Sequence, residues 1–222
     1  MAREKYKNVI PAFAVPVVCF ALFMAQVIAQ SGHAGDLSEK ITGTMAKFII
    51  SEKPQPVTQI TFYDEQGRKV NLSLMEGKVV LINFWATWCG PCRREMKDLD
   101  ELQAELGGSD FAVIALSSDR KGIPVVRKFY NDYNIRHLLA YNDKSGKSQR
   151  KFQIYGLPTT LLLDRQGREL GRLVGPAEWS SPEAIDLIRN AIASLILFNL
   201  LEKLNPNINS NRKFENLKIL KV

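Results

Sequence analysis

Hydrophobic and polar residues alternate along the chain in patterns that predict a strand, a helix and a second strand near its centre. Residues 79–86 are apolar except for Asn83, which is typical of a strand buried on both faces. Pro91 suits the first turn of a helix, and apolar side chains then recur at helical spacing, at positions 92, 96, 99, 102 and 106. Residues 111–116 repeat the pattern of a buried strand.

Shorter runs on either side of this unit predict two hairpins and two more helices. Residues 59–72 contain two extended runs around a Gln-Gly turn, and residues 157–175 repeat this arrangement. Residues 125–134 read as a helix, and residues 181–204 as a long amphipathic helix. The predicted order is two strands, strand-helix-strand, helix, two strands and helix, without an internal repeat.

The N-terminal region has a different pattern. Residues 9–29 are apolar except for Gln26, and at about 1.5 Å per residue such a run spans a hydrocarbon core of about 30 Å. The basic residues within 1–8 predict a cytoplasmic N-terminus. We therefore expect a single-pass signal anchor in the inner membrane, with everything after it exported to the periplasm. A signal peptide cleaved after Ala29 is the alternative.

The remaining boundaries follow from composition. Residues 30–56 show no sustained period, so we expect a tether between the membrane and the domain. Residues 57–204 are expected to form one domain, and residues 205–222 a basic tail. Much of the formal net charge of +7 lies at the two ends of the chain. We therefore expect no nucleic-acid partner.

Cys89 and Cys92 lie between the predicted central strand and helix, separated by Gly90 and Pro91. Free N–H groups at a helix start stabilise negative charge and lower the pKa of a cysteine there. Cys89 is thus the expected nucleophile and Cys92, one turn inward, the resolving thiol of a redox-active disulfide. A zinc site needs two more ligands, and the nearest downstream histidine, His137, is 45 residues away. We expect no metal and no other cofactor, and a purely structural disulfide is the remaining alternative.

The sequence VVLINFWATWCGPCRREM at 79–96, followed by Leu-Pro-Thr-Thr at 157–160, resembles the thioredoxin superfamily. It is most similar to the membrane-anchored TlpA/ResA-type thiol-disulfide oxidoreductases, over about residues 57–200. The resemblance implies an α/β, thioredoxin-like fold with a central mixed β-sheet flanked by helices. It also implies an N-terminal β-hairpin and a central α/β insert ahead of Pro158.

The resemblance assigns substrate-binding roles to three residues. Pro158 matches a cis-proline that faces the dithiol, with a trans turn proline as the alternative. Leu157 would offer its backbone N–H and C=O to an extended substrate segment, like an added strand. Trp88 would lie as a flat lid beside Cys89, with ordinary packing as the alternative.

Two further positions concern proton transfer. Glu95 matches an acid that ResA-like proteins carry three residues after the second cysteine, where it could tune or shuttle a proton for the dithiol. A solvated glutamate on the first turn of the helix is the equal alternative. Asn83 occupies the position of a buried aspartate in bacterial thioredoxins, so the proton path of thioredoxin is not expected here.

The resemblance also implies a function. The Gly-Pro dipeptide is the thioredoxin type, at about −270 mV against about −120 mV for the oxidant DsbA, so we expect a reductant of client proteins with disulfides. In an oxidising compartment a reductant must be recharged, which implies a membrane donor of the CcdA/DsbD type. The implied role is cytochrome c or cytochrome oxidase maturation. An exported oxidase or isomerase, and a non-catalytic copper or client carrier, are the alternatives.

Overall fold

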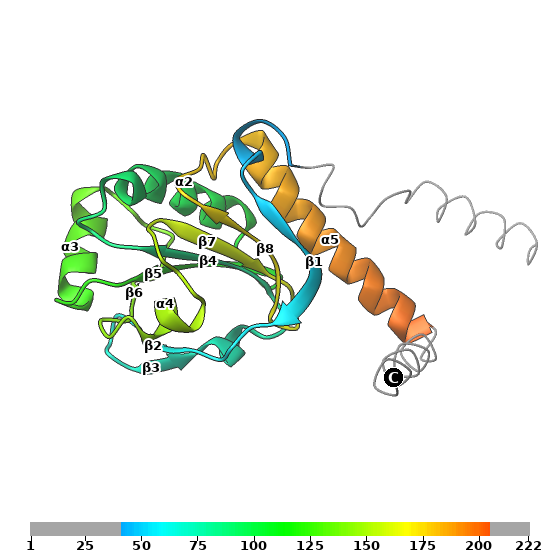
Figure 1. Cartoon of the computed structure of the whole chain (residues 1–222), viewed down its shortest axis with the longest axis horizontal. Helices are drawn as coiled ribbons and strands as arrows, with labels where there is room; N and C mark the ends of the chain where they lie inside the picture. Colours follow the sequence, from blue (N-terminus) through cyan, green and yellow to red (C-terminus); the bar gives the residue numbers. More distant parts are fainter. Residues whose placement is uncertain (1–40, 205–222) are drawn as a thin grey trace, which may run out of the picture. The chain divides into compact units, whose positions relative to one another are not determined.

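The computed structural model describes residues 41–204, with side chains to residue 193. Eight strands form one sheet in the order β1-β8-β7-β4-β5-β6-β2-β3 (Figure 1). The strands are β1 (Ile49–Pro56), β2 (Thr61–Tyr63), β3 (Lys69–Asn71), β4 (Val79–Trp85), β5 (Phe111–Ser117), β6 (Tyr141–Asn142), β7 (Thr159–Leu163) and β8 (Arg168–Val174). The helices are η2 (Gly43–Met45), η3 (Leu72–Met75), α2 (Gly90–Leu106), α3 (Ile123–Asp132), α4 (Lys147–Lys151) and α5 (Pro182–Leu204).

The sheet is mixed, as the sequence predicts. β4, β5 and β6 run parallel, whereas β7 is antiparallel to β4 and β8 is antiparallel to β7. The predicted hairpin β2–β3 forms and joins the sheet through β6. The expected insert between β5 and β7 contains α3, β6 and α4. The predicted thioredoxin-like α/β architecture is therefore confirmed.

Side chains of β4 alternate between two hydrophobic cores, one on each face of the sheet. Val79, Leu81 and Trp85 pack with buried residues of α2, α3 and α5. Ile82 and Phe84 pack on the opposite face with residues of the β2–β3 hairpin and with Phe152, which caps α4. β4 is buried along its whole length, which explains its almost wholly apolar sequence.

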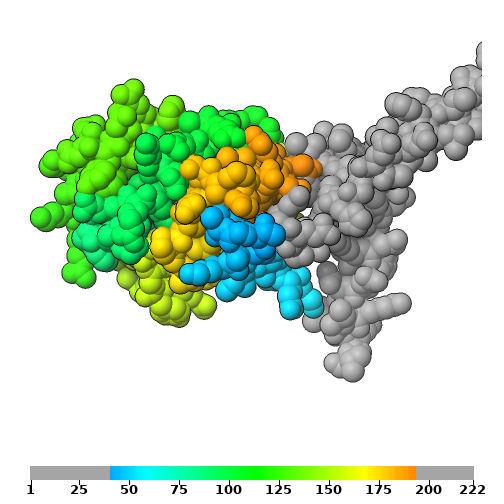
Figure 2. All heavy atoms as spheres, turned by 90° about the horizontal axis from the view of Figure 1, so that it is seen from above, coloured from blue at the N-terminus to red at the C-terminus, as the bar shows by residue number. Residues whose placement is uncertain are grey.

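The segment before residue 57 belongs to the domain, so the tether predicted over 30–56 is wrong for its second half. β1 pairs with β8, and Met45 and Phe48 are buried in the core formed with α2 and α5. Figure 2 shows this segment, in blue, against the orange residues of α5, where the Thr44 and Ser181 hydroxyls are 2.8 Å apart. The domain therefore begins well before residue 57.

Two physical properties explain why the local sequence pattern does not predict β1. β1 lies at the edge of the sheet, where the prolines of the segment cost no internal hydrogen bond. Its approach to β8 also depends on Gly171, because a Cβ at that position would lie 2.5 Å from the Ile49 carbonyl oxygen. Neither property appears as a hydrophobic period within the segment itself.

Several expectations lie outside the described residues. These are the basic N-terminus at 1–8, the signal anchor at 9–29, the first part of the tether at 30–40 and the tail at 205–222. Within residues 41–204, no helix is both long and apolar enough to span a bilayer.

Candidate active site

Cys89 and Cys92 form a disulfide at the start of α2, with an S–S distance of 2.06 Å. Cys89 is the N-cap of the helix, and its Sγ accepts a hydrogen bond from the Cys92 backbone N–H at 3.3 Å. Pro91 lies in the first turn, where its missing N–H has no helical acceptor to lose. The local sequence therefore places one sulfur at the end of the helix where backbone N–H groups favour negative charge.

The two sulfurs differ in access to solvent. The exposed fraction of Cys89 is 6%, and Cys92 is fully buried. Trp88, the residue before Cys89, is 70% exposed, so its ring is not part of the hydrophobic core. Only Cys89 can therefore meet a partner without rearrangement of the helix.

The Leu157–Pro158 peptide bond is cis, as the resemblance implies. Pro158 is buried, and its carbonyl accepts a hydrogen bond from Gly175 N–H at 2.9 Å. Within residues 41–193, the backbone N–H and C=O of Leu157 have no hydrogen-bond partner. These two groups are free to pair with an extended segment.

Glu95 is buried behind the disulfide, with 2% exposure, so the alternative of a solvated glutamate is wrong. Its Oε1 accepts a hydrogen bond from Asn83 Nδ2 at 2.8 Å. Its Oε2 accepts from the backbone N–H of Ala177 at 3.0 Å and from Trp179 Nε1 at 3.3 Å. Burial raises the pKa of Glu95 from 4.5 to about 7, although these three hydrogen bonds act in the opposite direction.

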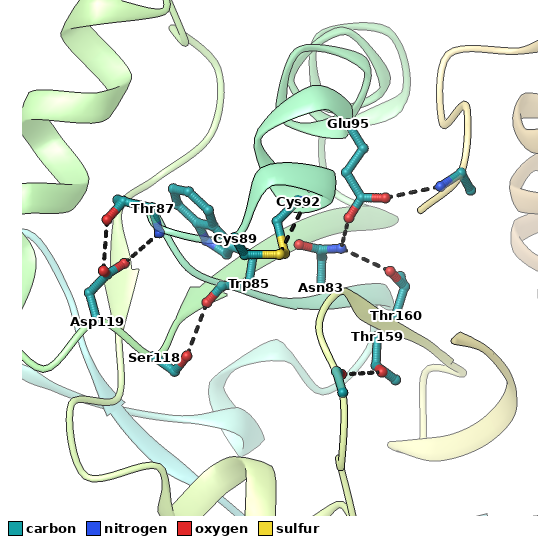
Figure 3. The surroundings of a disulfide bond; sticks show 12 residues. Asn83, Trp85, Thr87, Cys89, Cys92, Glu95, Ser118, Asp119, Thr159 and Thr160 are labelled. Atoms are coloured by element: carbon teal, nitrogen blue, oxygen red, sulfur yellow. Dashed lines mark hydrogen bonds between the residues drawn. A yellow bond between two sulfur atoms is a disulfide. The ribbon is translucent and has the colours of Figure 1, made fainter. Parts of the chain in front are cut away.

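Asn83 lies between Glu95 and the disulfide (Figure 3). Its amide nitrogen donates to Glu95 and to Thr160 Oγ1, the latter at 2.9 Å. Its Oδ1 is buried and accepts no hydrogen bond from any residue in the described part of the chain, and Figure 3 shows this oxygen on the side of the disulfide. A thiol formed on reduction of the disulfide would be a donor for it.

A buried carboxylate on the other side of the cysteines was missed in the sequence. Asp119, at the end of β5, accepts hydrogen bonds from the Thr87 backbone N–H at 2.9 Å and from Thr87 Oγ1 at 2.7 Å (Figure 3). Ser118 Oγ donates to the Trp85 carbonyl at 3.2 Å. The sequence signal that could have identified Asp119 is the polar run that follows the buried strand at 111–116. Neighbouring parallel strands end at the same edge of a sheet, so residues that follow β5 lie near those that follow β4.

This arrangement defines a class of protein. A disulfide at a helix N-terminus, a cis-proline loop and a buried carboxyl group on a thioredoxin-like sheet form a site for thiol-disulfide exchange. Residues 54–168, more than half of the chain, match the profile of the AhpC/TSA family. The chain therefore belongs to the AhpC/TSA family, and the predicted membership of the thioredoxin-like proteins is confirmed.

Individual proteins with similar sequences are consistent with membership of this family. The thiol-disulfide oxidoreductase ResA of Bacillus thuringiensis (strain Al Hakam) is 35% identical over 112 residues, which cover 50% of this chain and 64% of ResA. The thiol:disulfide interchange protein DsbE of Pseudomonas aeruginosa is 30% identical over 123 residues, or 55% of this chain and 66% of DsbE. This chain thus spans just under two thirds of either relative.

Among solved structures, a candidate DsbE from Chlorobium tepidum superimposes with a TM-score of 0.55 at 29% sequence identity. The match covers 65% of this chain and 98% of that protein. The aligned part of this chain therefore corresponds to nearly the whole of that protein.

Proposed function

We propose that this protein is a thiol-disulfide oxidoreductase that reduces disulfides of client proteins. The observation that carries the proposal is the Cys89–Cys92 disulfide at the N-terminus of α2. The names of the ResA and DsbE relatives, which are thiol-disulfide oxidoreductase and thiol:disulfide interchange protein, support it.

The reaction begins with the reduced protein. The Cys89 thiolate attacks one sulfur of the client disulfide, and the other client sulfur leaves as a thiolate that takes up a proton. Cys92, after losing its proton, attacks the Cys89 sulfur of the mixed disulfide. The second client sulfur is released, the client gains two thiols and two electrons, and the protein is left with the Cys89–Cys92 disulfide.

In this proposal, Glu95 would take up the proton that Cys92 loses. With a pKa raised to about 7, its carboxyl group is partly ionised near neutral pH and can both accept and release a proton. Asn83 bonds Glu95 and turns its free Oδ1 toward the disulfide. This oxygen would hold the Cys92 thiol in position as an acceptor, with Glu95 as the base.

The client would bind across the cis-proline loop. The unpaired N–H and C=O of Leu157 can form two backbone hydrogen bonds to an extended segment that carries the client disulfide. Trp88 would cover the other side of the reacting sulfurs as an exposed flat surface. Pro158 would set the direction of the Leu157 backbone.

The cellular role in this proposal follows the TlpA/ResA resemblance. The domain would be held on the periplasmic side of the inner membrane by the apolar segment 9–29. It would keep cysteines reduced during cytochrome c or cytochrome oxidase maturation. A membrane thiol transporter of the CcdA/DsbD type would return two electrons after each turnover.

The equilibrium reduction potential tests the direction of the reaction. The protein is equilibrated with a series of reduced and oxidised dithiothreitol, and the fraction of the disulfide is measured by thiol alkylation. A value near the roughly −270 mV of thioredoxin supports a reductant, whereas a value near −120 mV would make it an oxidase. Insulin reduction should be lost in Cys89→Ser, and retained activity in that variant would contradict the site.

Membrane attachment needs its own measurement. The full chain should stay with membranes after a wash with high salt, and a fusion of alkaline phosphatase after residue 56 should be active only outside the cytoplasm. Release by salt would favour cleavage after Ala29 over a membrane anchor.

A further inference from the structure

The active-site loop is fastened to a loop that carries two cations. Asp119 binds Thr87 through two hydrogen bonds, and Arg120 and Lys121 follow Asp119 directly in the chain. Thr87, Trp88, Arg120 and Lys121 line one surface cavity of about 560 Å³. The cations are therefore held beside the residues that lead into Cys89.

A second cavity shares part of its lining with the first. It has a volume of about 400 Å³ and shares Arg120 and Lys121 with its neighbour. Its other lining residues include Tyr63, Lys144 and the start of α3. The two cavities, here together called the basic cleft, share two cations; one is lined by Trp88 and the other by Tyr63 and Gly67 of the β2–β3 hairpin.

The cations of the basic cleft have no partner among the residues that the structure describes. Arg120, Lys121 and Lys144 are exposed, and within residues 41–193 none of them forms a hydrogen bond or an ion pair. Unpaired cations in a concave surface raise the local concentration of anions and speed their association.

The carboxylates nearby do not cancel this charge at the surface. Asp119 is buried, and both of its oxygens accept hydrogen bonds from Thr87 or Ser117. Asp143 is also buried, and its oxygens accept from Ser145 and the Ser148 backbone. The charged atoms that reach solvent in the basic cleft are therefore mainly positive.

The surface on the Glu95 side of the disulfide is mainly acidic, in contrast to the basic cleft. A cavity of about 400 Å³ there is lined by Glu95, Asp98 and Glu178, with Arg94 as its cation. Desolvation, together with Glu101 and Glu178, raises the pKa of Asp98. A negatively charged segment would be repelled by Asp98 and Glu178 on this side and attracted by the cations on the other.

We propose that the basic cleft binds an acidic segment of the client polypeptide next to the client disulfide. The proposal rests on the proposed reductase function and adds the charge of the substrate. An extended chain suits a depression that starts beside Cys89, whereas a flat anionic membrane would not enter it. The contacts are surface ion pairs, so they should act on association and vary with salt.

Two experiments test the basic cleft, and the first does not depend on catalysis. A fluorescein-labelled, cysteine-free peptide with a run of glutamates is titrated with the full protein, and binding is followed by anisotropy. We expect binding that weakens at high salt and about tenfold tighter than for the matching glutamine peptide. The variant Arg120→Gln/Lys121→Gln should bind the two peptides alike.

The matched control is Lys47→Gln/Lys97→Gln, which removes the same charge outside the basic cleft and should keep the preference for glutamate. A charge-reversed variant, Arg120→Glu/Lys121→Glu, should prefer a lysine peptide and thus shows that loss of binding is not loss of folding. Equal binding of the acidic and neutral peptides to the wild-type protein would overturn the proposal. Binding to anionic phosphatidylglycerol vesicles without binding to the acidic peptide would overturn it as well.

The second experiment compares rates of disulfide reduction. The reduced protein reacts with two cystine-containing peptides that differ only in glutamate or glutamine beside the cysteines. The wild-type protein should reduce the acidic peptide faster, and the ratio of the two rates should approach one in Arg120→Gln/Lys121→Gln. Failure to reduce either peptide would contradict the proposed function, whereas equal rates would contradict only the acidic-segment proposal.

Discussion

Asn83 Nδ2 donates a 2.8 Å hydrogen bond to the Glu95 carboxylate and so joins the centre of β4 to the start of α2. Both side chains are buried, at 0% and 2% exposure. The Asn83 amide therefore occupies a position at which an acidic side chain would repel the Glu95 carboxylate. Among the described residues, Glu95 is thus the buried carboxyl group behind the disulfide, and its titration is expected to make stability depend on pH.

Stability should fall as the pH rises through the titration of Glu95. The folded-state pKa of about 7 lies above the usual 4.5, so the folded protein holds this proton more tightly than the unfolded chain. The stabilisation is fully present below about pH 4.5 and is lost as the pH rises to about 7, and it amounts to at most about 3 kcal/mol.

Glu95→Gln removes this titration. We expect the loss of unfolding free energy between about pH 5 and pH 8 to be smaller in Glu95→Gln than in the wild-type protein, measured by urea unfolding of the oxidised forms. Glu101→Gln, at an exposed position on the same helix, should keep the wild-type pH dependence. An unchanged pH dependence in Glu95→Gln would show that Glu95 is ionised throughout this range.

The two cysteines should react at different rates. In the reduced protein, iodoacetamide should modify Cys89 first, because Cys92 is fully buried and Cys89 caps the helix. Mass spectrometry of quenched samples gives both rates. Cys92→Ser should trap mixed disulfides with clients, and equal alkylation rates for the two cysteines would contradict the assignment of Cys89 as nucleophile.

Asp119→Ala should destabilise the domain by about 2 kcal/mol, because the Thr87 backbone N–H loses its acceptor. Asp132→Ala breaks only an exposed ion pair with Lys128 and should cost less than about 1 kcal/mol. Urea unfolding of both variants gives the comparison. Equal effects would mean that the Asp119–Thr87 contact does not hold the active-site loop.

Met45→Ala should destabilise the domain by about 2–5 kcal/mol, because it leaves a cavity at a fully buried position. Ile49→Ala, four residues later and 64% exposed, should change the unfolding free energy by no more than about 0.5 kcal/mol. Thermal or urea unfolding checks both. A negligible effect of Met45→Ala would indicate that residues 41–56 are a tether and not part of the folded domain.

The sequence by itself determined the elements around the disulfide. β4, α2 and the β7–β8 hairpin were predicted because their signals are local: an unbroken apolar run, a helical period after a proline and a Gln-Gly turn. The roles of Cys89 and Cys92 were predicted for the same reason, since their spacing and the helix start are contained in four consecutive residues.

Only the tertiary structure decided the environment of the polar groups. Glu95 is paired by Ala177 and Trp179, which are 82 and 84 residues away, and Thr87 is held by Asp119, 32 residues away. Likewise, β1 is a strand because it pairs with the edge of the sheet formed by β8. Desolvation, hydrogen-bond partners and edge pairing all arise from segments that are distant in the chain, so no local pattern contains them.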